Sequence, residues 1–117
     1  MGKFIITQRS NHEYQFSLKA GNGEIILTSE GYIQKASCRK GIDSVKNNAQ
    51  DDSRYDRRTA VNGKEYFVLK ARNGEIIGKS QLYSSKTAME NGIHSVQAHA
   101  PSAEIMDQTL KNSHYGS

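Results

Sequence analysis

The chain has 117 residues, which is enough for one domain with a modest hydrophobic core. A hydrophobic fraction of 35%, a charged fraction of 24% and a single Pro are typical of a polar globular protein and exclude collagen-like and Pro-rich disordered chains. The net charge of +4 and the pI near 9.2 indicate a mild basic excess. No apolar run approaches the roughly 18 residues of a membrane span, and the opening residues lack the apolar segment of a signal peptide. We therefore expect a cytoplasmic protein without a membrane partner.

Three antiparallel strands are expected before residue 30. The apolar segment KFIITQR at 3–9 turns at Asn11-His12 into EYQFSLKA, where apolar and polar residues alternate as in a half-buried strand. Asn22-Gly23 then supplies two residues that tolerate positive φ, which predicts a tight type I′ hairpin turn. Lys19 and Glu24 flank this turn and are expected to pair across it.

A helix is predicted over residues 34–49, because one face collects apolar residues at spacings of four, three and four: Cys38, Ile42, Val45 and Ala49. Gly41 lies in the middle of this helix, where Gly costs about 1 kcal/mol relative to Ala. We interpret it as a close contact with the sheet or with another helix. The following segment, SRYDRRT at 53–59, is expected to add a strand.

The second half of the chain repeats this order. Asn-Gly pairs at 62–63 and 73–74 predict two more hairpins, and the apolar spacing predicts a helix over 85–99 with Ser84 or Ser85 as its N-cap and Pro101 as its stop. AEIMDQT at 103–109 is expected to form a last strand. KNSHYGS at 111–117 has no pattern and is predicted to be a disordered tail.

An internal duplication explains the repetition. A shift of 51 residues aligns 15–49 with 66–100 without a gap, and 17 of the 35 positions are identical, including the phrase NGEII. We therefore expect one domain over residues 1–110, built of two repeats at about 3–52 and 54–107. The predicted fold class is α+β: the repeats share one antiparallel sheet, two helices cover one face of it, and the other face meets solvent.

The tandem NGEII hairpins, the SxxY step that follows them and the GI-x-SV helices resemble the YegP-like family, a bacterial group of small proteins whose function is unknown. The resemblance covers about residues 3–107. It implies two β3-α-β repeats that form a single sheet and exchange their C-terminal strands, and it implies a monomer, because both repeats are in one chain. It brings no catalytic residue.

No motif in the chain points to catalysis, to a cofactor or to a metal. The four histidines are scattered, His94 and His99 are five residues apart, and the single Cys cannot build a zinc site with them. Cys38 belongs to the apolar helical face, so it is interpreted as a core residue and not as a nucleophile. We expect a non-enzymatic protein.

Two sets of polar residues are candidates for a site. The first set is retained in both repeats and marks either a twin binding site or structural caps: Ser29, Tyr32, Lys35, Ser80, Tyr83 and Lys86. The second set lies where the basic surplus gathers and could contact nucleic acid: Arg54, Arg57, Arg58 and Arg72.

Two functional hypotheses follow from these candidates. The first is a binding or interaction module that contacts nucleic acid or a protein partner. The alternative is a small-molecule binder or an enzyme with a cleft at the pseudo-two-fold axis between the repeats, where Ser, Tyr and Lys side chains of both repeats would converge.

Overall fold

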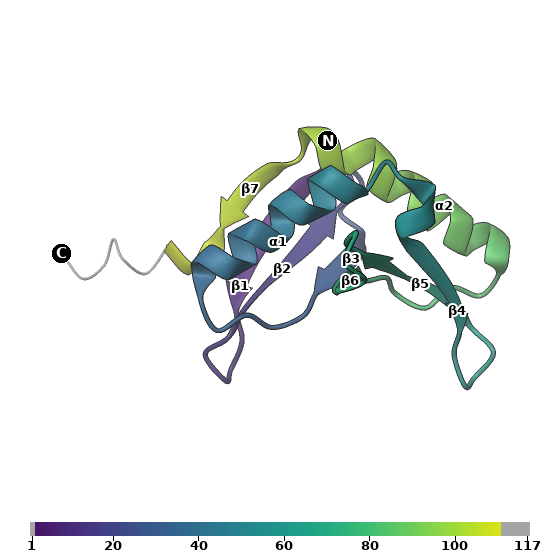
Figure 1. The fold of residues 1–117 in the computed structure, drawn as a ribbon, viewed down its shortest axis with the longest axis horizontal. Coiled ribbons are helices and arrows are strands. Elements are labelled where there is room, and N and C mark those ends of the chain that lie inside the picture. The colour runs from purple at the N-terminus through teal and green to yellow at the C-terminus, as the bar shows by residue number, and fades with distance from the viewer. Residues whose placement is uncertain (1, 111–117) are drawn as a thin grey trace.

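The computed structural model describes residues 2–110, so the tail predicted at 111–117 lies outside the described residues. These residues form one sheet of seven strands with two helices (Figure 1). The first half contains β1 (Lys3–Gln8), β2 (Tyr14–Lys19), β3 (Ile25–Ser29) and α1 (Lys35–Asn48). β4 (Tyr55–Thr59) follows α1 as the C-terminal strand of the first repeat, and the second half contains β5 (Glu65–Lys70), β6 (Ile76–Lys79), α2 (Lys86–His99) and β7 (Glu104–Asp107). Single 3-10 turns, Asp52–Arg54 and Ala100–Ser102, follow the helices.

The core lies between the helices and one face of the sheet. Alternate residues of β1, β2 and β5 point into it, and they include the fully buried rings of Phe4, Phe16 and Phe67. The apolar face predicted for each helix is buried as expected, with Cys38 in α1 and Met89 in α2 at equivalent places. Figure 1 shows α1 in front of β1 and β2 and α2 on the side of β5; α1 contacts β2, β5 and β6, and α2 contacts β5 and β3.

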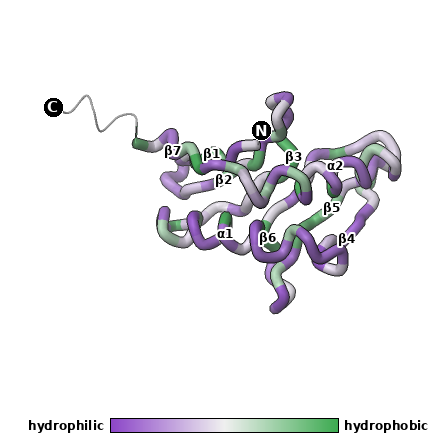
Figure 2. Tube along the Cα trace, turned by 90° about the horizontal axis from the view of Figure 1, so that it is seen from above, coloured by the Kyte–Doolittle hydropathy of each residue, from purple (hydrophilic) through white to green (hydrophobic). Residues whose placement is uncertain are grey.

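The helix bounds agree with the sequence prediction to within one residue at each end. The Ser85 hydroxyl accepts a hydrogen bond from the Ala88 amide and so acts as the predicted N-cap of α2. Figure 2 shows the hydrophobic stretches on the inner strands and the hydrophilic ones on the projecting turns. Neither described helix combines the length and the apolar character that crossing a membrane would require.

The Asn-Gly turns are not of the predicted type I′. Gly23, Gly63 and Gly74 have φ between 85° and 89°, but the preceding asparagines do not have positive φ. Instead the Gly23 amide donates to the Ala20 carbonyl, and the Ala20 amide donates to the Glu24 carbonyl. This pattern is a type I turn closed by a glycine in the left-handed region, and Asn22 stabilises it by accepting from the Glu24 amide.

The two repeats meet where β3 pairs antiparallel with β6. The paired residues Thr28 and Lys79 are themselves equivalent under the 51-residue shift, so the pseudo-two-fold axis passes through this pair. The sheet order is β4-β5-β6-β3-β2-β1-β7. The strands β5 and β6 therefore lie on one side of the junction, and β3, β2 and β1 lie on the other.

The exchange of C-terminal strands is confirmed, but the expectation of a wholly antiparallel sheet is wrong. β4, which follows α1, pairs with β5 of the second half, and β7, which follows α2, pairs with β1 of the first half. β7 runs parallel to β1. By pseudo-symmetry β7 should lie antiparallel beside β2, but β1 already occupies that place. β7 is therefore displaced to the outside of β1, and keeping its direction makes it parallel to that strand.

Candidate functional site

The face of the sheet opposite the helices, called the open face below, carries the side chains that alternate with the core residues. Its cationic side chains are Lys3, Lys19, Arg58, Lys70 and Lys79. Two acidic side chains, Asp56 and Glu104, belong to the strands of this face. The open face therefore carries a surplus of positive charge.

Lys79 and Tyr66 form the centre of this surface. Tyr66 alternates with the core residue Phe67 on β5, and the ammonium of Lys79 lies 5.7 Å from the centre of the Tyr66 ring. Lys79 forms no ion pair within residues 2–110. A partly exposed aromatic ring beside an unpaired ammonium can stack on a planar group and hold an anion at the same time.

Part of the positive charge on the open face is neutralised. Asp56 lies 2.9 Å from Arg58 and 3.4 Å from Lys70, measured between the charged atoms. The hydrogen bond from Arg58, assisted by the charge of Lys70, lowers the pKa of Asp56, which therefore stays ionised at neutral pH. Lys3, Lys19 and Lys79 have no such partner among the described residues.

The arginines predicted to contact nucleic acid do not form one patch. Arg57 points to the helix side, where its guanidinium donates to Glu90 at 3.0 Å and to Asp52 at 3.0 Å. Arg54 is held by Asp51 at 3.3 Å. These are pairings that the sequence did not reveal, because the acidic partners come from a turn and from α2.

The other two arginines of this set also lie apart. Arg58 is on the open face, and Arg72 is exposed in the turn between β5 and β6, where it makes no ion pair with another described residue. Of the four predicted contacts, the structure therefore places only Arg58 on the surface that contains Tyr66 and Lys79.

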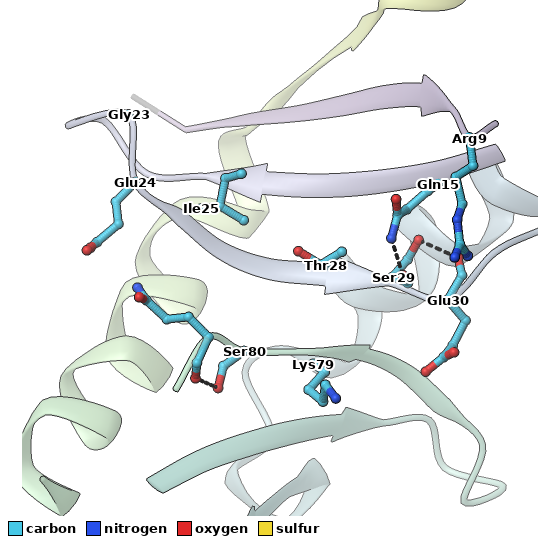
Figure 3. Close-up of a pocket in the computed structure, with 11 residues that line it drawn as sticks. Arg9, Gln15, Gly23, Glu24, Ile25, Thr28, Ser29, Glu30, Lys79 and Ser80 are labelled. Carbon is cyan, nitrogen blue, oxygen red and sulfur yellow. Dashed lines mark hydrogen bonds between the residues drawn. The ribbon is translucent and has the colours of Figure 1, made fainter. Parts of the chain in front are cut away.

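A polar hollow of about 620 Å³ opens on this face at the junction of the repeats (Figure 3). Residues from both repeats line it, including Thr28, Ser29, Lys79 and Ser80. This position agrees with the hypothesis of a cleft at the pseudo-two-fold axis. However, of the repeated Ser, Tyr and Lys residues expected to converge there, only Ser29 and Ser80 line this hollow, whereas Tyr32, Tyr83, Lys35 and Lys86 do not.

The two repeated serines have structural roles. The Ser29 hydroxyl accepts a hydrogen bond from the Phe16 amide at 2.9 Å and donates to the Glu30 carbonyl at 2.8 Å. Ser80 makes the equivalent pair of bonds with Phe67 and Gln81, at 3.0 and 2.7 Å. Each hydroxyl thus satisfies backbone groups where a strand ends, which explains why both repeats retain a serine there.

The repeated tyrosines are structural as well. Tyr32 stacks on Phe16 with 6.4 Å between ring centres, and Tyr83 stacks on Phe67 at 6.5 Å. A Cβ on Gly92 would collide with the Tyr83 hydroxyl, and the same holds for Gly41 and Tyr32. The helix glycines therefore make room for a tyrosine of their own repeat, and not for the other helix.

The repeated lysines have diverged. Lys35 lies 3.0 Å from Asp107 of β7, and its ammonium is 5.7 Å from the centre of the Tyr14 ring. Lys86 is exposed and forms no ion pair with another described residue. The two lysines consequently do not form twin sites.

The described residues contain no candidate metal site, and the thiol of Cys38 is protonated. No group of three His, Cys, Asp or Glu side chains within residues 2–110 could hold a metal ion. Cys38 is fully buried, and burial raises the pKa of its thiol to about 11, so the thiol is protonated at neutral pH.

Sequence reasoning missed Lys3 as a member of the surface and did not single out Lys79 and Tyr66 as its centre. The available signal was the alternation along the strands, which places Lys3 and Lys19 opposite the core residues Phe4 and Leu18. The missing information was the strand order, which brings β5, β6 and β2 together on one face.

Comparison with known proteins gives a consistent family. The family model of DUF1508, a domain of unknown function, matches residues 10–56 and again residues 60–107. YegP of Escherichia coli K12 is 49% identical over 108 residues, which cover 92% of this chain and 98% of YegP. A UPF0339 protein of Bordetella pertussis is 50% identical over 109 residues, which cover 93% of this chain and 98% of that protein.

Two solution NMR structures share the fold. The structure of YegP from Escherichia coli, described as a protein of unknown function, has a TM-score of 0.88 at 48% identity and covers 92% of both chains. A UPF0339 protein from Shewanella oneidensis has a TM-score of 0.90 at 46% identity and covers 97% of both chains. With both repeats matched and half of the residues identical over most of its length, the chain belongs to the DUF1508 family of YegP-like proteins.

Proposed function

We propose that the chain is a non-enzymatic binding module whose open face binds single-stranded nucleic acid. The observation that carries this proposal is the placement of unpaired lysines beside an accessible tyrosine on one face, with Lys79 above Tyr66 at its centre. Lysines hold phosphates through charge, and an aromatic ring stacks on any base.

Strand geometry supports a single strand in preference to a duplex. An open sheet presents a broad surface on which unstacked bases can lie against side chains, whereas duplex readout requires an element that enters a groove. In this chain Arg57 is held by Glu90 and Lys35 by Asp107 on the helix face, and the lysines there that form no ion pair with a described residue, such as Lys40 and Lys86, make no cation–π contact of the kind that Lys79 makes with Tyr66. The helices therefore contribute to the core, and the sheet contributes the binding surface.

We also propose that the protein acts as a cytoplasmic monomer. The single buried Cys fits a reducing compartment. The junction between β3 and β6 supports a monomer, because the bulky Leu27 side chain packs against Gly78 and so favours the pairing of unlike repeats. Binding would then involve one chain and one strand of nucleic acid.

Fluorescence anisotropy with labelled single-stranded DNA, RNA and duplex DNA tests the binding proposal. We expect single strands to bind more tightly than duplex, and a rise from about 50 to 200 mM salt to weaken binding by about tenfold or more, because cations are released from the phosphates. Lys79→Gln and Tyr66→Ala should each weaken binding several-fold.

The matched control is Lys86→Gln, which removes the same charge from an exposed position on α2. If Lys86→Gln weakens binding as much as Lys79→Gln, the attraction is a property of net charge and the open face is not the site. Absence of binding at about 50 mM salt would remove the nucleic-acid proposal.

A further inference from the structure

The outer corner of the open face contains a second hollow, of about 310 Å³, between β1, β2 and β7. We propose that this hollow binds a small amphipathic anion, whose charged head lies between Lys3 and Lys19 and whose apolar body covers Ile5 and Met106. The hollow is below called the Lys3–Lys19 hollow. This inference does not depend on nucleic-acid binding, which is centred on Tyr66 and Lys79.

The two lysines form an uncompensated pair. Lys3 and Lys19 are direct partners in the β1–β2 register, so both side chains leave the same face of the sheet. Like charges directly opposite each other on neighbouring strands destabilise a sheet. Glu24, which the sequence predicts as a partner of Lys19, forms no ion pair within residues 2–110. An anion between the ammonium groups would relieve the repulsion.

One carboxylate lies on the neighbouring strand. Glu104 of β7 is the register partner of Lys3, but it is exposed and forms no ion pair with any described residue. It lowers the positive potential at the edge of the hollow without occupying it. Removing this charge should therefore strengthen the binding of an anion.

Apolar side chains provide the floor. Ile5 follows Lys3 by two residues on β1, so its side chain leaves the same face, and its register partner on β7 is Met106. Ile5 is 8% exposed and Met106 is 41% exposed, although a thioether on an edge strand gains from being covered. An anionic head with a short apolar body matches this combination, whereas a fully polar anion leaves Met106 in contact with water.

At the equivalent position in the second repeat, the lysine has an ion-pair partner within the protein. Lys70 is the repeat equivalent of Lys19, and the strand register makes Asp56 the counterpart of Ile5. Asp56 lies 3.4 Å from Lys70 and forms an ion pair with it, which it shares with Arg58. β4 is also the edge of the sheet, so no strand provides a counterpart of Met106.

The first repeat differs at both points. It has Ile5 where the second has the neutralising acid, and the displaced β7 adds an apolar wall. The two equivalent lysines thus differ: Lys70 is paired with an acid of the protein, whereas Lys19 has no such partner among the described residues and can bind a ligand. This contrast supplies a matched internal control.

NMR titration of the full chain with octanoate and with octyl phosphate tests the proposal, and the tighter of the two identifies the head group. We expect saturable shifts in the amides of β1, β7 and residues 20–23. Inorganic phosphate and octanol, each carrying half of the required chemistry, should bind at least about tenfold more weakly.

Variants locate the site. Lys3→Gln combined with Lys19→Gln should weaken octanoate binding by about tenfold or more, whereas Lys70→Gln should leave it unchanged. Glu104→Gln should strengthen binding. Both lysines are on the surface, so these changes do not test folding.

Three results would overturn the inference: no saturable shift with either amphiphile, equal binding by the double lysine variant, or inorganic phosphate that binds as tightly as octyl phosphate. If oligonucleotides bind and the amphiphiles do not, only this inference fails. The reverse result would remove the nucleic-acid proposal alone.

Discussion

Gly92 shows how one residue in each repeat is selected by its neighbour. A Cβ at this position would lie 2.7 Å from Cζ of Tyr83 and 3.2 Å from Cε2 of Phe67. Replacing Gly by Ala in an exposed helix interior gains about 1 kcal/mol, but forcing a methyl group into a packed interior costs about 1–3 kcal/mol. We therefore predict that Gly92→Ala lowers the free energy of unfolding in urea denaturation.

Asn91→Ala is the control for this prediction, because Asn91 is exposed on the same helix. It should be neutral or stabilising, since Ala is the better helix former. Stabilisation by Gly92→Ala would show that the Tyr83 ring moves aside easily. The Tyr83 hydroxyl is buried without a hydrogen-bond partner among the described residues, so the interior gains nothing polar from keeping it in place.

At the scale of elements, one carboxylate joins β7 to α1, in addition to the backbone pairing of β7 with β1. The Asp107 side chain is 4% exposed and lies 3.0 Å from Lys35 and 3.4 Å from Arg39, both on α1. It also accepts hydrogen bonds from the amide and hydroxyl of Thr109. These contacts join the exchanged strand of the second repeat to the helix of the first.

The stability that Asp107 contributes depends on pH. Burial alone would raise the pKa of this carboxyl, but the hydrogen bonds from Thr109 and Lys35 outweigh burial and lower it. Because the folded-state pKa lies below the unfolded value, the contribution is present above about pH 4 and is lost as pH falls through the folded pKa. Asp107→Asn should therefore destabilise the protein by about 1–3 kcal/mol at neutral pH and by less in acid.

Urea unfolding of the wild type, Asp107→Asn and Glu104→Gln at about pH 7 and about pH 3 measures this difference. Glu104 lies on the same strand but is exposed and unpaired within residues 2–110, so its variant should match the wild type. If Asp107→Asn destabilised the protein equally at both pH values, the ionised carboxylate of Asp107 would not be the source of the stability.

The elements themselves could be predicted from the sequence, because alternation, helical spacing and the duplication are local signals. The helix bounds, the N-cap at Ser85 and the exchange of strands are confirmed. The parallel pairing of β7 could not be predicted, because it depends on β1 already occupying the place beside β2. The turn type was also wrong, because Asn22 uses its side chain and not a positive φ.

The candidate site was less predictable than the fold. Arg57 was expected on a basic patch, but its partner Glu90 lies 33 residues away on α2, and no local pattern connects them. Lys79 and Tyr66 meet only after β5 and β6 pair. Tertiary contacts therefore determine which cationic side chains form ion pairs within the protein and which remain available at its surface.

At the scale of the whole molecule, the junction of the repeats is complementary and not symmetric. Leu27 and Gly78 are equivalent under the 51-residue shift, and a Cβ on Gly78 would lie 2.9 Å from Cγ of the fully buried Leu27. Two first repeats would place Leu against Leu, and two second repeats would leave a void. The duplication has thus diverged so that each half fits the other half.

An exchange of these two residues tests that complementarity. Leu27→Gly should lose about 3–5 kcal/mol by leaving a cavity, and Gly78→Leu should lose about 1–3 kcal/mol or more by overpacking. The double variant restores one large and one small side chain on either side of the axis, so its loss should fall short of the sum by at least about 1 kcal/mol. Urea denaturation of the four proteins gives this coupling energy, and light scattering shows whether each variant has the same oligomeric state as the wild type. Additive losses would mean that Leu27 and Gly78 are selected independently, and the pairing of unlike halves would then have to come from elsewhere along β3 and β6.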